Sequence, residues 1–410
     1  NDSGFTVEGS GADGNETTVA FTNPTADRTI TLPNATGNLA VFTTAPTAAI
    51  SDGSSGQFLK TDGSGALSFA TAASGADLYA ANESSPAAQP SATGANAVAI
   101  GDSAVAEGGY AFAAGLGASA SGNYSVALGR IASSTQNYAT AIGNNSDANG
   151  SSSISIGLNT TAGSTYSTAF GAGNSGVGAV TAGLGAMALG GSYASGADSL
   201  AAAIANNTSS YGATGAYSVA IGRQVKATAN TASSLGGYLN VASDAYSTTL
   251  GGYGNQASGD YATVAGGYFN VASGVGSFAH GLRASATQYG KKAYASGYFA
   301  ATGDAQGGKF ILRSDTTDAT AEALTTNNST ANATNQIVAA SDTCITFHGT
   351  ITAMQNGAQA YGGWEIKGML VNDGGTTSLA LGNVSDMAAN NASSWAVALS
   401  ADNTNNALKI

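Results

Sequence analysis

A short pattern of apolar and small residues returns along the middle of the chain. In most copies large apolar residues flank a small one and a glycine follows, as in Val126-Ala127-Leu128-Gly129. Alternate residues of a strand point to opposite faces, so the pattern predicts a strand with alanine on one face and large apolar residues on the other. A unit this short cannot bury its own apolar face, which indicates stacked coils. The first six copies are 14 residues apart and close on Gly101, Gly115, Gly129, Gly143, Gly157 and Gly171.

A second run of small residues follows each closing glycine, as in Ala118-Ser119-Ala120-Ser121-Gly122. One unit therefore supplies two short strands and two turns, which is one coil of a β-solenoid. We expect the recurrent glycines to provide the positive φ that these turns need. Most later units are longer than 14 residues, and the longer ones predict loop insertions. Their closing positions are expected at residues 190, 205, 222, 236, 251, 266, 281 and 297, of which Ala205 alone is not glycine.

Composition agrees with an all-β protein, since 58 glycines accompany only 9% charged residues and no helical periodicity occurs. The predicted organisation is an N-terminal β shaft with attachment modules over 1–73, a linker over 74–91, the repeat array over 92–300 and a C-terminal β domain over 301–410. Within the first segment, an Asp62-Gly63 turn signal predicts a β-hairpin that ends near Phe69.

The formal net charge of −12 disfavours nucleic acid and anionic membranes as partners. No apolar run reaches membrane-spanning length, so we expect no membrane insertion. Cys344 is the only cysteine, which excludes an intrachain disulfide. We interpret it as a buried strand residue.

The large apolar residues exceed what a thin coil can cover, so one face is expected to pack against copies of the chain. A symmetric homotrimer is the natural closure. The residues expected in this packing are Val126, Leu128, Gly129, Ile142, Ile156 and Phe170.

Tyrosine occupies the position five before the closing residue in half of the units, which predicts a ladder along one edge. Aromatic stacking that stabilises the register is one interpretation, and a carbohydrate-binding strip is the other. The ladder comprises Tyr110, Tyr124, Tyr138, Tyr166, Tyr217, Tyr246 and Tyr261.

The Ser-Val-Ala-Leu-Gly type of repeat at 125–129 resembles the heads of trimeric autotransporter adhesins over about half of the chain. That resemblance implies left-handed β-rolls packed in threes. It also suggests a neck where the array ends, in which Arg283, Lys291 and Lys292 cross to neighbouring chains. A solvated charge cluster is the alternative for these three residues.

Other segments resemble marine and cyanobacterial phage tail fibres: 28–37, the 53–69 unit, the Gly-Gly-Tyr repeats from Gly251 and the segments around 300–320 and 395–404. This resemblance implies a sandwich-like C-terminal β domain with further strands after Ile410. Trp364 and Trp395 are predicted to lie in alternating strands and are expected in its core.

No pattern indicates catalysis, a cofactor or a metal site. His280 and His348 lack neighbouring ligands at metal spacing, and the carboxylates are scattered rather than paired. A metal on a trimer axis at His280 stays open, because one histidine per chain becomes three. We expect a binding protein rather than an enzyme.

The sequence thus predicts an extracellular structural protein, a homotrimeric phage tail fibre in the virion that recognises and adheres to the host. Its expected partners are tail, baseplate or neck proteins at the N-terminal region and a host-surface polysaccharide or outer-membrane receptor. The alternatives are the head of a bacterial trimeric autotransporter adhesin and a tail-spike polysaccharide depolymerase.

Overall fold

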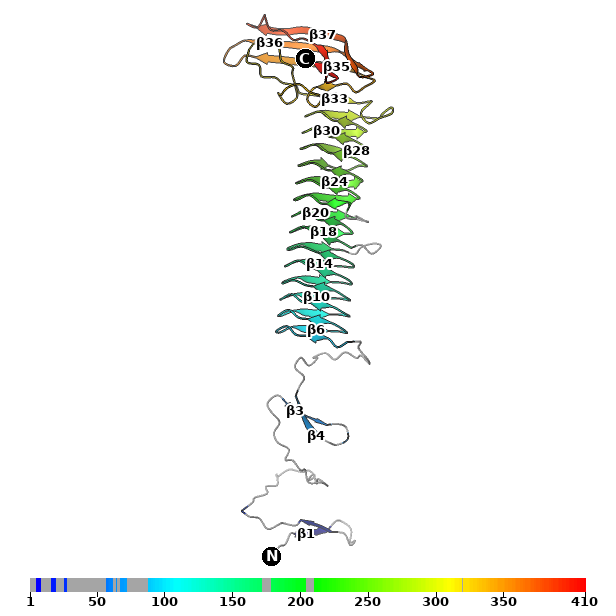
Figure 1. Cartoon of the computed structure of the whole chain (residues 1–410), viewed down its shortest axis with the longest axis vertical. Helices are drawn as coiled ribbons and strands as arrows, with labels where there is room; N and C mark the ends of the chain where they lie inside the picture. Colours follow the sequence, from blue (N-terminus) through cyan, green and yellow to red (C-terminus); the bar gives the residue numbers. More distant parts are fainter. Residues whose placement is uncertain are drawn as a thin grey trace. The chain divides into compact units, whose positions relative to one another are not determined.

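The computed structural model describes residues 88–171, 178–203, 210–318 and 320–410, with short stretches before them at 5–8, 16–19, 26–27, 57–61, 64 and 67–71. The chain divides into two compact units, Asn1–Ala73 and Ser74–Ile410 (Figure 1). In the first unit, β1 (Phe5–Glu8) pairs antiparallel with β2 (Glu16–Val19). The predicted hairpin is present, because β3 (Gln57–Thr61) pairs antiparallel with β4 (Leu67–Thr71). The module expected over 28–37 lies outside the described residues.

The second unit begins with a β-solenoid of about 14 turns that spans residues 91–295, and the described residues contain no helix, as the repeat and composition predicted. Two parallel sheets form its walls, and each coil adds one strand to each of them. The first sheet consists of β6 (Val98–Ile100), β8 (Phe112–Ala114), β10 (Val126–Leu128), β12 (Thr140–Ile142), β14 (Ile154–Ile156), β16 (Thr168–Phe170), β18 (Met187–Gly190), β20 (Leu200–Ala203), β22 (Val219–Arg223), β24 (Ser233–Tyr238), β26 (Thr248–Thr249), β28 (Thr263–Tyr268), β30 (Phe278–Leu282), β32 (Lys292–Ala295) and the antiparallel β33 (Gly307–Lys309).

The second sheet is built from two-residue strands that alternate along the chain with the strands of the first sheet, beginning with β5 before β6. These are β5 (Ser91–Ala92), β7 (Val105–Ala106), β9 (Ser119–Ala120), β11 (Ser133–Ser134), β13 (Asp147–Ala148), β15 (Thr161–Ala162), β17 (Val180–Thr181), β19 (Tyr193–Ala194), β21 (Gly212–Ala213), β23 (Lys226–Ala227), β25 (Val241–Ala242), β27 (Gln256–Ala257), β29 (Val271–Ala272) and β31 (Ser285–Ala286).

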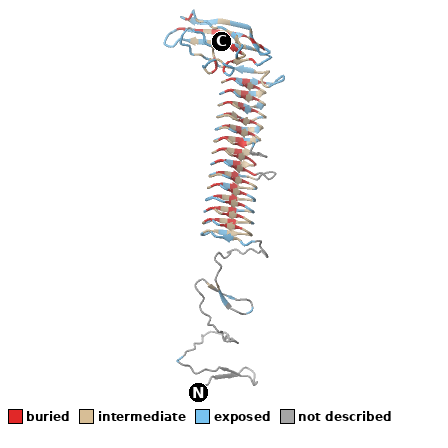
Figure 2. Ribbon diagram, in the orientation of Figure 1, coloured by how far each residue is buried: buried red, intermediate tan, exposed pale blue. Residues whose placement is uncertain are grey.

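Alanine fills the narrow space between the two sheets, as the alternation predicted. Ala127 in β10 and Ala120 in β9 are fully buried, as are the corresponding alanines of most other coils. Figure 2 shows this buried column running along the solenoid. Larger interior side chains would push the sheets apart, because protein interiors tolerate little extra volume.

Closing glycines such as Gly101 and Gly115 adopt positive φ as predicted, but the turns also contain left-handed residues that the prediction did not include. Left-handed residues recur every seven positions through the first coils, but most of them are not glycine: Tyr110, Tyr124 and Tyr138 have φ of 59°, 57° and 60°, and Ile131 has 48°. Bulky residues rarely adopt this region, because Cβ approaches the backbone there. The repetition of the turn in every coil holds these residues in that conformation.

The recurrent glycines are needed for the approach of one coil to the next. A Cβ at Gly122, whose φ is not positive, would collide with the carbonyl of Gln136 in the following coil. Glycine is needed at the closing position Gly129 for two reasons. Its φ is 134°, and a Cβ there would collide with the carbonyl of Gly143. Backbone therefore packs directly on backbone at these corners.

The strand register corrects two closing positions. Gly190 pairs with Ala203 rather than aligning with Ala205, and Gly281 pairs with Ala295 rather than aligning with Gly297. The extra residues of the longer repeats include 172–177 and 204–209, which lie outside the described residues. The repeat pattern misplaced the closing positions of these two coils. The strand register is set by backbone hydrogen bonds, and these do not require glycine at the closing position.

Buried asparagines replace interior alanines where the repeat lengthens to 15 residues, a feature that the sequence analysis missed. Asn255 Nδ2 donates to the carbonyls of Gly251 and Gly267, and its Oδ1 accepts from the backbone N–H of Asn270. Asn240 makes the equivalent bonds one coil earlier. The Gly-Gly-x-x-Asn spacing is the signal, because buried amides need such partners.

Both solenoid sheets are capped where the array ends. The antiparallel strand β33 covers the edge of β32. At the other sheet, the Gln306 side chain accepts from the Ser285 N–H at 2.7 Å and donates to its carbonyl at 3.0 Å. An amide side chain thereby replaces a further strand and protects the exposed edge.

The C-terminal domain places two three-stranded antiparallel sheets around a small core. One consists of β35 (Thr343–Met354), β36 (Tyr361–Asp373) and β37 (Thr376–Asn390), and the other of β34 (Ile337–Val338), β39 (Ala407–Lys409) and β38 (Ser400–Asp402). Leu370 of the first sheet and Leu408 of the second are buried together with Ala339. A backbone hydrogen bond from Tyr289 to Thr334 at 2.8 Å joins this domain to the solenoid.

We predict that Gly122→Ala lowers the free energy of unfolding by about 1–3 kcal/mol, because the added methyl group meets the Gln136 carbonyl. The matched control is Gly290→Ala, at φ of 65° with open space around the new Cβ, which should cost about 1 kcal/mol. Chemical denaturation of both variants measures the difference. Equal losses would contradict the steric origin of the glycine repeat.

Candidate functional site

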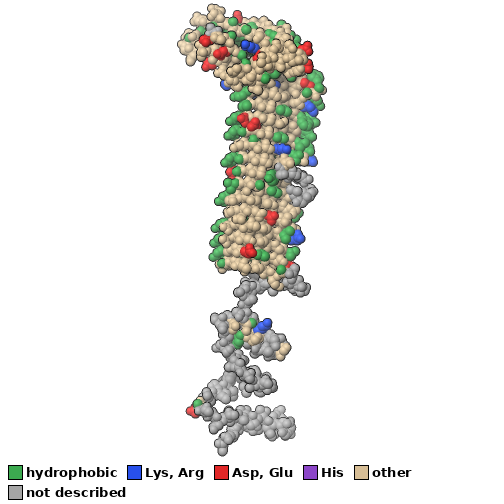
Figure 3. Space-filling view, in the orientation of Figure 1, with side chains coloured by type: hydrophobic (Ala, Val, Ile, Leu, Met, Phe, Trp, Pro, Cys, Tyr) green, Lys and Arg blue, Asp and Glu red, His purple; other side chains and the backbone are tan. Residues whose placement is uncertain are grey.

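The outer faces of the two solenoid sheets differ in chemistry. The first sheet presents large apolar side chains, such as Leu128 at 43% and Phe170 at 52% exposure. The second sheet presents one outward residue per coil, which is polar at Ser119, Ser133 and Asp147 but apolar at Val105 and Val241. Figure 3 shows apolar side chains along the solenoid flanks and few charged ones between them. An apolar row of this length is unusual on a monomer and marks a contact surface. Five of the predicted packing residues lie on this face, namely Val126, Leu128, Ile142, Ile156 and Phe170, whereas Gly129 follows β10 at the corner.

Tyrosine rings form a stack along one edge of the solenoid. The centroids of Tyr110 and Tyr124 are 5.0 Å apart with an interplanar angle of 3°, and those of Tyr124 and Tyr138 are 5.2 Å apart at 2°. Tyr246 and Tyr261 stack in the same way at 5.0 Å. The residues occupy equivalent left-handed positions, so their Cα–Cβ bonds leave successive coils in parallel.

This stacking decides which part of the ladder a ligand can reach. Sugars stack on the faces of aromatic rings, but Tyr124 has another ring against each face. Stacked tyrosines therefore offer ring edges and hydroxyl groups to solvent. Tyr166 and Tyr217 stand apart from these stacks and are 67% and 58% exposed.

A second aromatic group lies in the 15-residue coils, and the sequence analysis did not single it out. Tyr253 stacks on Tyr268 at 5.3 Å, and Phe269 packs edge-on against both rings. The Arg283 guanidinium lies 5.4 Å from the Phe269 centroid and continues the group toward the end of the array. The repeated Gly-Gly-Tyr motif could have predicted this aromatic group, since its 15-residue spacing aligns the tyrosines of successive coils.

The three basic residues at the end of the array lie in different environments. Arg283 stacks over Tyr298 at 4.1 Å, whereas the Lys291 ammonium is covered by the chain and lies 5.7 Å from the Phe310 centroid. Lys292 is exposed on β32. Interpretation as a solvated cluster is therefore wrong for Lys291, which is 8% exposed. Burial lowers the pKa of Lys291 to about 8, because a charged ammonium loses its hydration there.

The two tryptophans also differ. Trp364 is 5% exposed and lies on the buried face of β36, with its ring against Gly362. Trp395 precedes β38 in a segment without strand pairing and is half-buried. The prediction of a strand at Trp395 is wrong, although the segment after it still alternates between covered and exposed residues.

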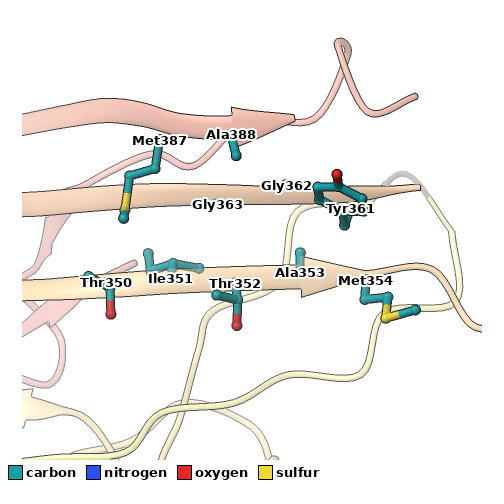
Figure 4. Close-up of a pocket in the computed structure, with 10 residues that line it drawn as sticks. All are labelled: Thr350, Ile351, Thr352, Ala353, Met354, Tyr361, Gly362, Gly363, Met387 and Ala388. Atoms are coloured by element: carbon teal, nitrogen blue, oxygen red, sulfur yellow. The ribbon is translucent and has the colours of Figure 1, made fainter. Parts of the chain in front are cut away.

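An open pocket of about 550 Å³ lies at one end of the large C-terminal sheet. Figure 4 shows Met387 of β37 extending across the Gly362–Gly363 stretch of β36 toward Ile351 of β35. Its lining is apolar apart from a few hydroxyl groups, and Met354 and Met387 are largely exposed. The full lining is Thr350, Ile351, Thr352, Ala353, Met354, Tyr361, Gly362, Gly363, Met387 and Ala388.

The titratable residues of the C-terminal region form local bonds. His348 Nε2 lies 2.7 Å from Glu365 Oε1 across β35 and β36, and this hydrogen bond holds the pKa of Glu365 below its usual value. Asp304 accepts from the N–H groups of Ala301, Ala300 and Phe299, which lower its pKa. Cys344 lies in a strand as expected but is exposed rather than buried, because β35 turns it outward.

His280 is exposed on β30 and lies 4.9 Å from the ring of Tyr294. Within the described ranges, no three His, Cys, Asp or Glu residues gather in a way that could hold a metal ion. In that same part of the chain, no helix is long and apolar enough to cross a membrane.

Comparison with known proteins identifies the repeat type. The YadA head domain repeat matches residues 92–118, 120–146 and 148–174. Each matched segment contains two consecutive coils, so the family unit and the structural unit agree. No curated protein matches the chain. The array is therefore similar to adhesin heads over its first coils, and this similarity suggests an adhesin-like function.

We predict that Tyr124→Ser destabilises the solenoid more than Tyr166→Ser. The first change removes two stacked ring pairs, each worth about 0.5–1.5 kcal/mol, whereas Tyr166 has no stacked ring partner among the described residues. Serine fits either turn, because Ser152 occupies the same position with φ of 55°. The expected difference in unfolding free energy is about 1–3 kcal/mol by chemical denaturation. Similar losses in both variants would show that stacking does not stabilise the register.

We further predict that stability rises between pH 8 and 10.5 through Lys291. Its folded pKa of about 8 lies below the ordinary 10.5, so the unfolded chain binds more protons over this interval. The unfolding free energy then increases with pH there, by up to about 3 kcal/mol. Lys291→Met should remove this rise, and Lys292→Met should retain it. Thermal melts at pH 7.5 and 10.5 make the comparison, and a rise that persists in Lys291→Met would contradict the assignment.

Proposed function

We propose that this chain is the rod-forming part of a homotrimeric extracellular adhesion protein. The observation that carries the proposal is the asymmetry of the solenoid: the outer face of the first sheet carries a row of exposed large apolar residues, whereas the second sheet mixes polar side chains with less exposed apolar ones. Three copies that turn the first face toward a common axis would remove its apolar row from water and leave the second sheet exposed. The match to the YadA head domain repeat supports this arrangement.

In this proposal the solenoid provides reach, and its sides and the C-terminal domain provide contact surfaces. Three chains present each surface three times, so weak individual contacts add up to firm attachment. The chain acts by binding and not by catalysis. Release of reducing sugars from capsular polysaccharide by the purified protein would overturn that part.

A more specific proposal concerns whether a virion or a bacterial cell displays this protein. The segments that resemble phage fibres favour a tail fibre on a virion, with tail, baseplate or neck proteins at the N-terminal region. The head repeats are equally compatible with a bacterial autotransporter adhesin. Immunogold electron microscopy with an antibody to the solenoid distinguishes the two, since label would decorate either phage tails or the bacterial surface.

We predict that Leu128→Glu with Phe170→Glu dissociates the assembly, because two charges per chain would enter an apolar interface. Ser133→Glu, on the outer face of the second sheet, is the matched control and should leave the assembly intact. Sedimentation equilibrium should give three times the chain mass of 39.7 kDa for the native protein and the control. A native protein that sediments as a monomer would contradict the proposal, and binding of the labelled trimer to intact cells tests the adhesive role.

A further inference from the structure

The backbone of the tyrosine ladder repeats in every coil, including coils in which the ladder position is not a tyrosine. Each ladder residue donates its N–H to a carbonyl of the preceding coil, at 2.9 Å for Tyr138, 2.9 Å for Ser152 and 3.0 Å for Tyr166. Their φ values are 60°, 55° and 59°. Ser152 therefore occupies a ladder position between two tyrosines, with a hydroxymethyl group in place of a ring.

The rings on either side of Ser152 lack a stacking partner toward it. Among the described residues Tyr138 stacks only on Tyr124, and Tyr166 stacks on no ring. The exposed fraction rises accordingly, from 51% for the sandwiched Tyr124 to 59% for Tyr138 and 67% for Tyr166. One rung of the ladder is thus open.

The size of this gap suits one six-membered ring. Filled rungs are 5.0–5.2 Å apart, so two coil steps separate the neighbours of Ser152 by roughly 10 Å. A guest ring midway would lie about 5 Å from each tyrosine, which is within the range of stacked rings. A ligand would gain both ring faces, which the filled rungs do not offer.

A second gap repeats the arrangement further along the same edge. Thr231 occupies the ladder position between Tyr217 and Tyr246, with φ of 58°, and its N–H donates to the Ala216 carbonyl. Its hydroxyl donates to Asn230 Oδ1 at 2.6 Å. The two gaps are five coil steps apart, or roughly 24 Å at the strand spacing.

We propose that the gaps at Ser152 and Thr231 bind pyranose rings of a neutral surface polysaccharide, an assignment that rests on the proposed adhesive function and names its ligand class. Around the gap at Ser152, the edge residues 137–139, 151–153 and 165–167 include no charged residue, and Asn137, Ser151, Ser152 and Thr165 supply amides and hydroxyls. A sugar matches this rim with its own hydroxyls. At this gap a cation would lack a counter-charge, and an aromatic side chain would leave the polar groups unsatisfied.

The experiment fills the gaps and asks whether binding is lost. Wild-type protein, Ser152→Tyr with Thr231→Tyr, and Ser103→Tyr are applied to an array of neutral cello-, xylo-, malto- and chito-oligosaccharides. Calorimetry then measures the Kd of the best binder. Ser103 is the matched control, because it also has a left-handed φ, of 57°, but lies outside the ladder. Tyrosine at Ser152 and Thr231 should extend the stack and raise the melting temperature, so lost binding cannot be ascribed to unfolding.

The expected result is a Kd at least ten-fold weaker in the filled variant and unchanged in Ser103→Tyr, with saturation-transfer NMR placing sugar ring protons against tyrosine. Equal affinity in the filled variant would overturn the proposal, as would binding of tetramethylammonium or 4-methylphenol but of no oligosaccharide. Cell attachment separates the two proposals. If the filled variant still attaches to cells, the adhesive function stands and the glycan gap fails as its basis. If sugar binding depends on the gaps but no cell is bound, the adhesive function fails alone.

Discussion

The direct stacking of one coil's backbone on the next is the constraint on which the rest of this structure depends. At corners such as Gly122 and Gly129 a Cβ would meet the carbonyl of the following coil, so the coils approach only where side chains are absent. The approach sets a common register for both sheets. That register places each interior residue above another small interior residue, as Ala127 above Ala141 and Ser134 above Ala148, and every ladder residue above its equivalent.

A coil this thin divides its side chains sharply between inside and outside. The interior holds mostly alanine, together with serine, threonine, asparagine such as the hydrogen-bonded Asn255, and the two valines Val225 and Val264. Most larger apolar residues lie outside, and they gather on the first sheet because its strands alternate with small residues inward. In the proposed trimer the partner chains would cover these apolar residues. His348–Glu365 is the only ion pair among the described residues, so hydrophobic association would be the main force that holds such an assembly together.

In a repetitive structure, the absence of one side chain from a regular row leaves a defined space. In most proteins a serine between two tyrosines has no special environment. Here the fixed register aligns Tyr138, Ser152 and Tyr166, so the missing ring becomes a space of defined size. A surface built from repeats can therefore acquire a binding site by losing one side chain.

The sequence by itself determined the solenoid, the alanine interior and the aligned tyrosines, because a 14-residue period encodes local strand and turn geometry that every coil repeats. It misplaced the coils that close on Ala203 and Ala295, since their register follows backbone hydrogen bonds rather than glycine. Only the tertiary structure decided that left-handed turns carry tyrosine, that Lys291 is buried while Lys292 is exposed, and that Cys344 and Trp395 depart from their expected places. Whether a residue near or in the C-terminal domain is buried depends on which segment of the chain covers it. Those segments are far apart in the sequence, and no repeat there indicates which of them will meet.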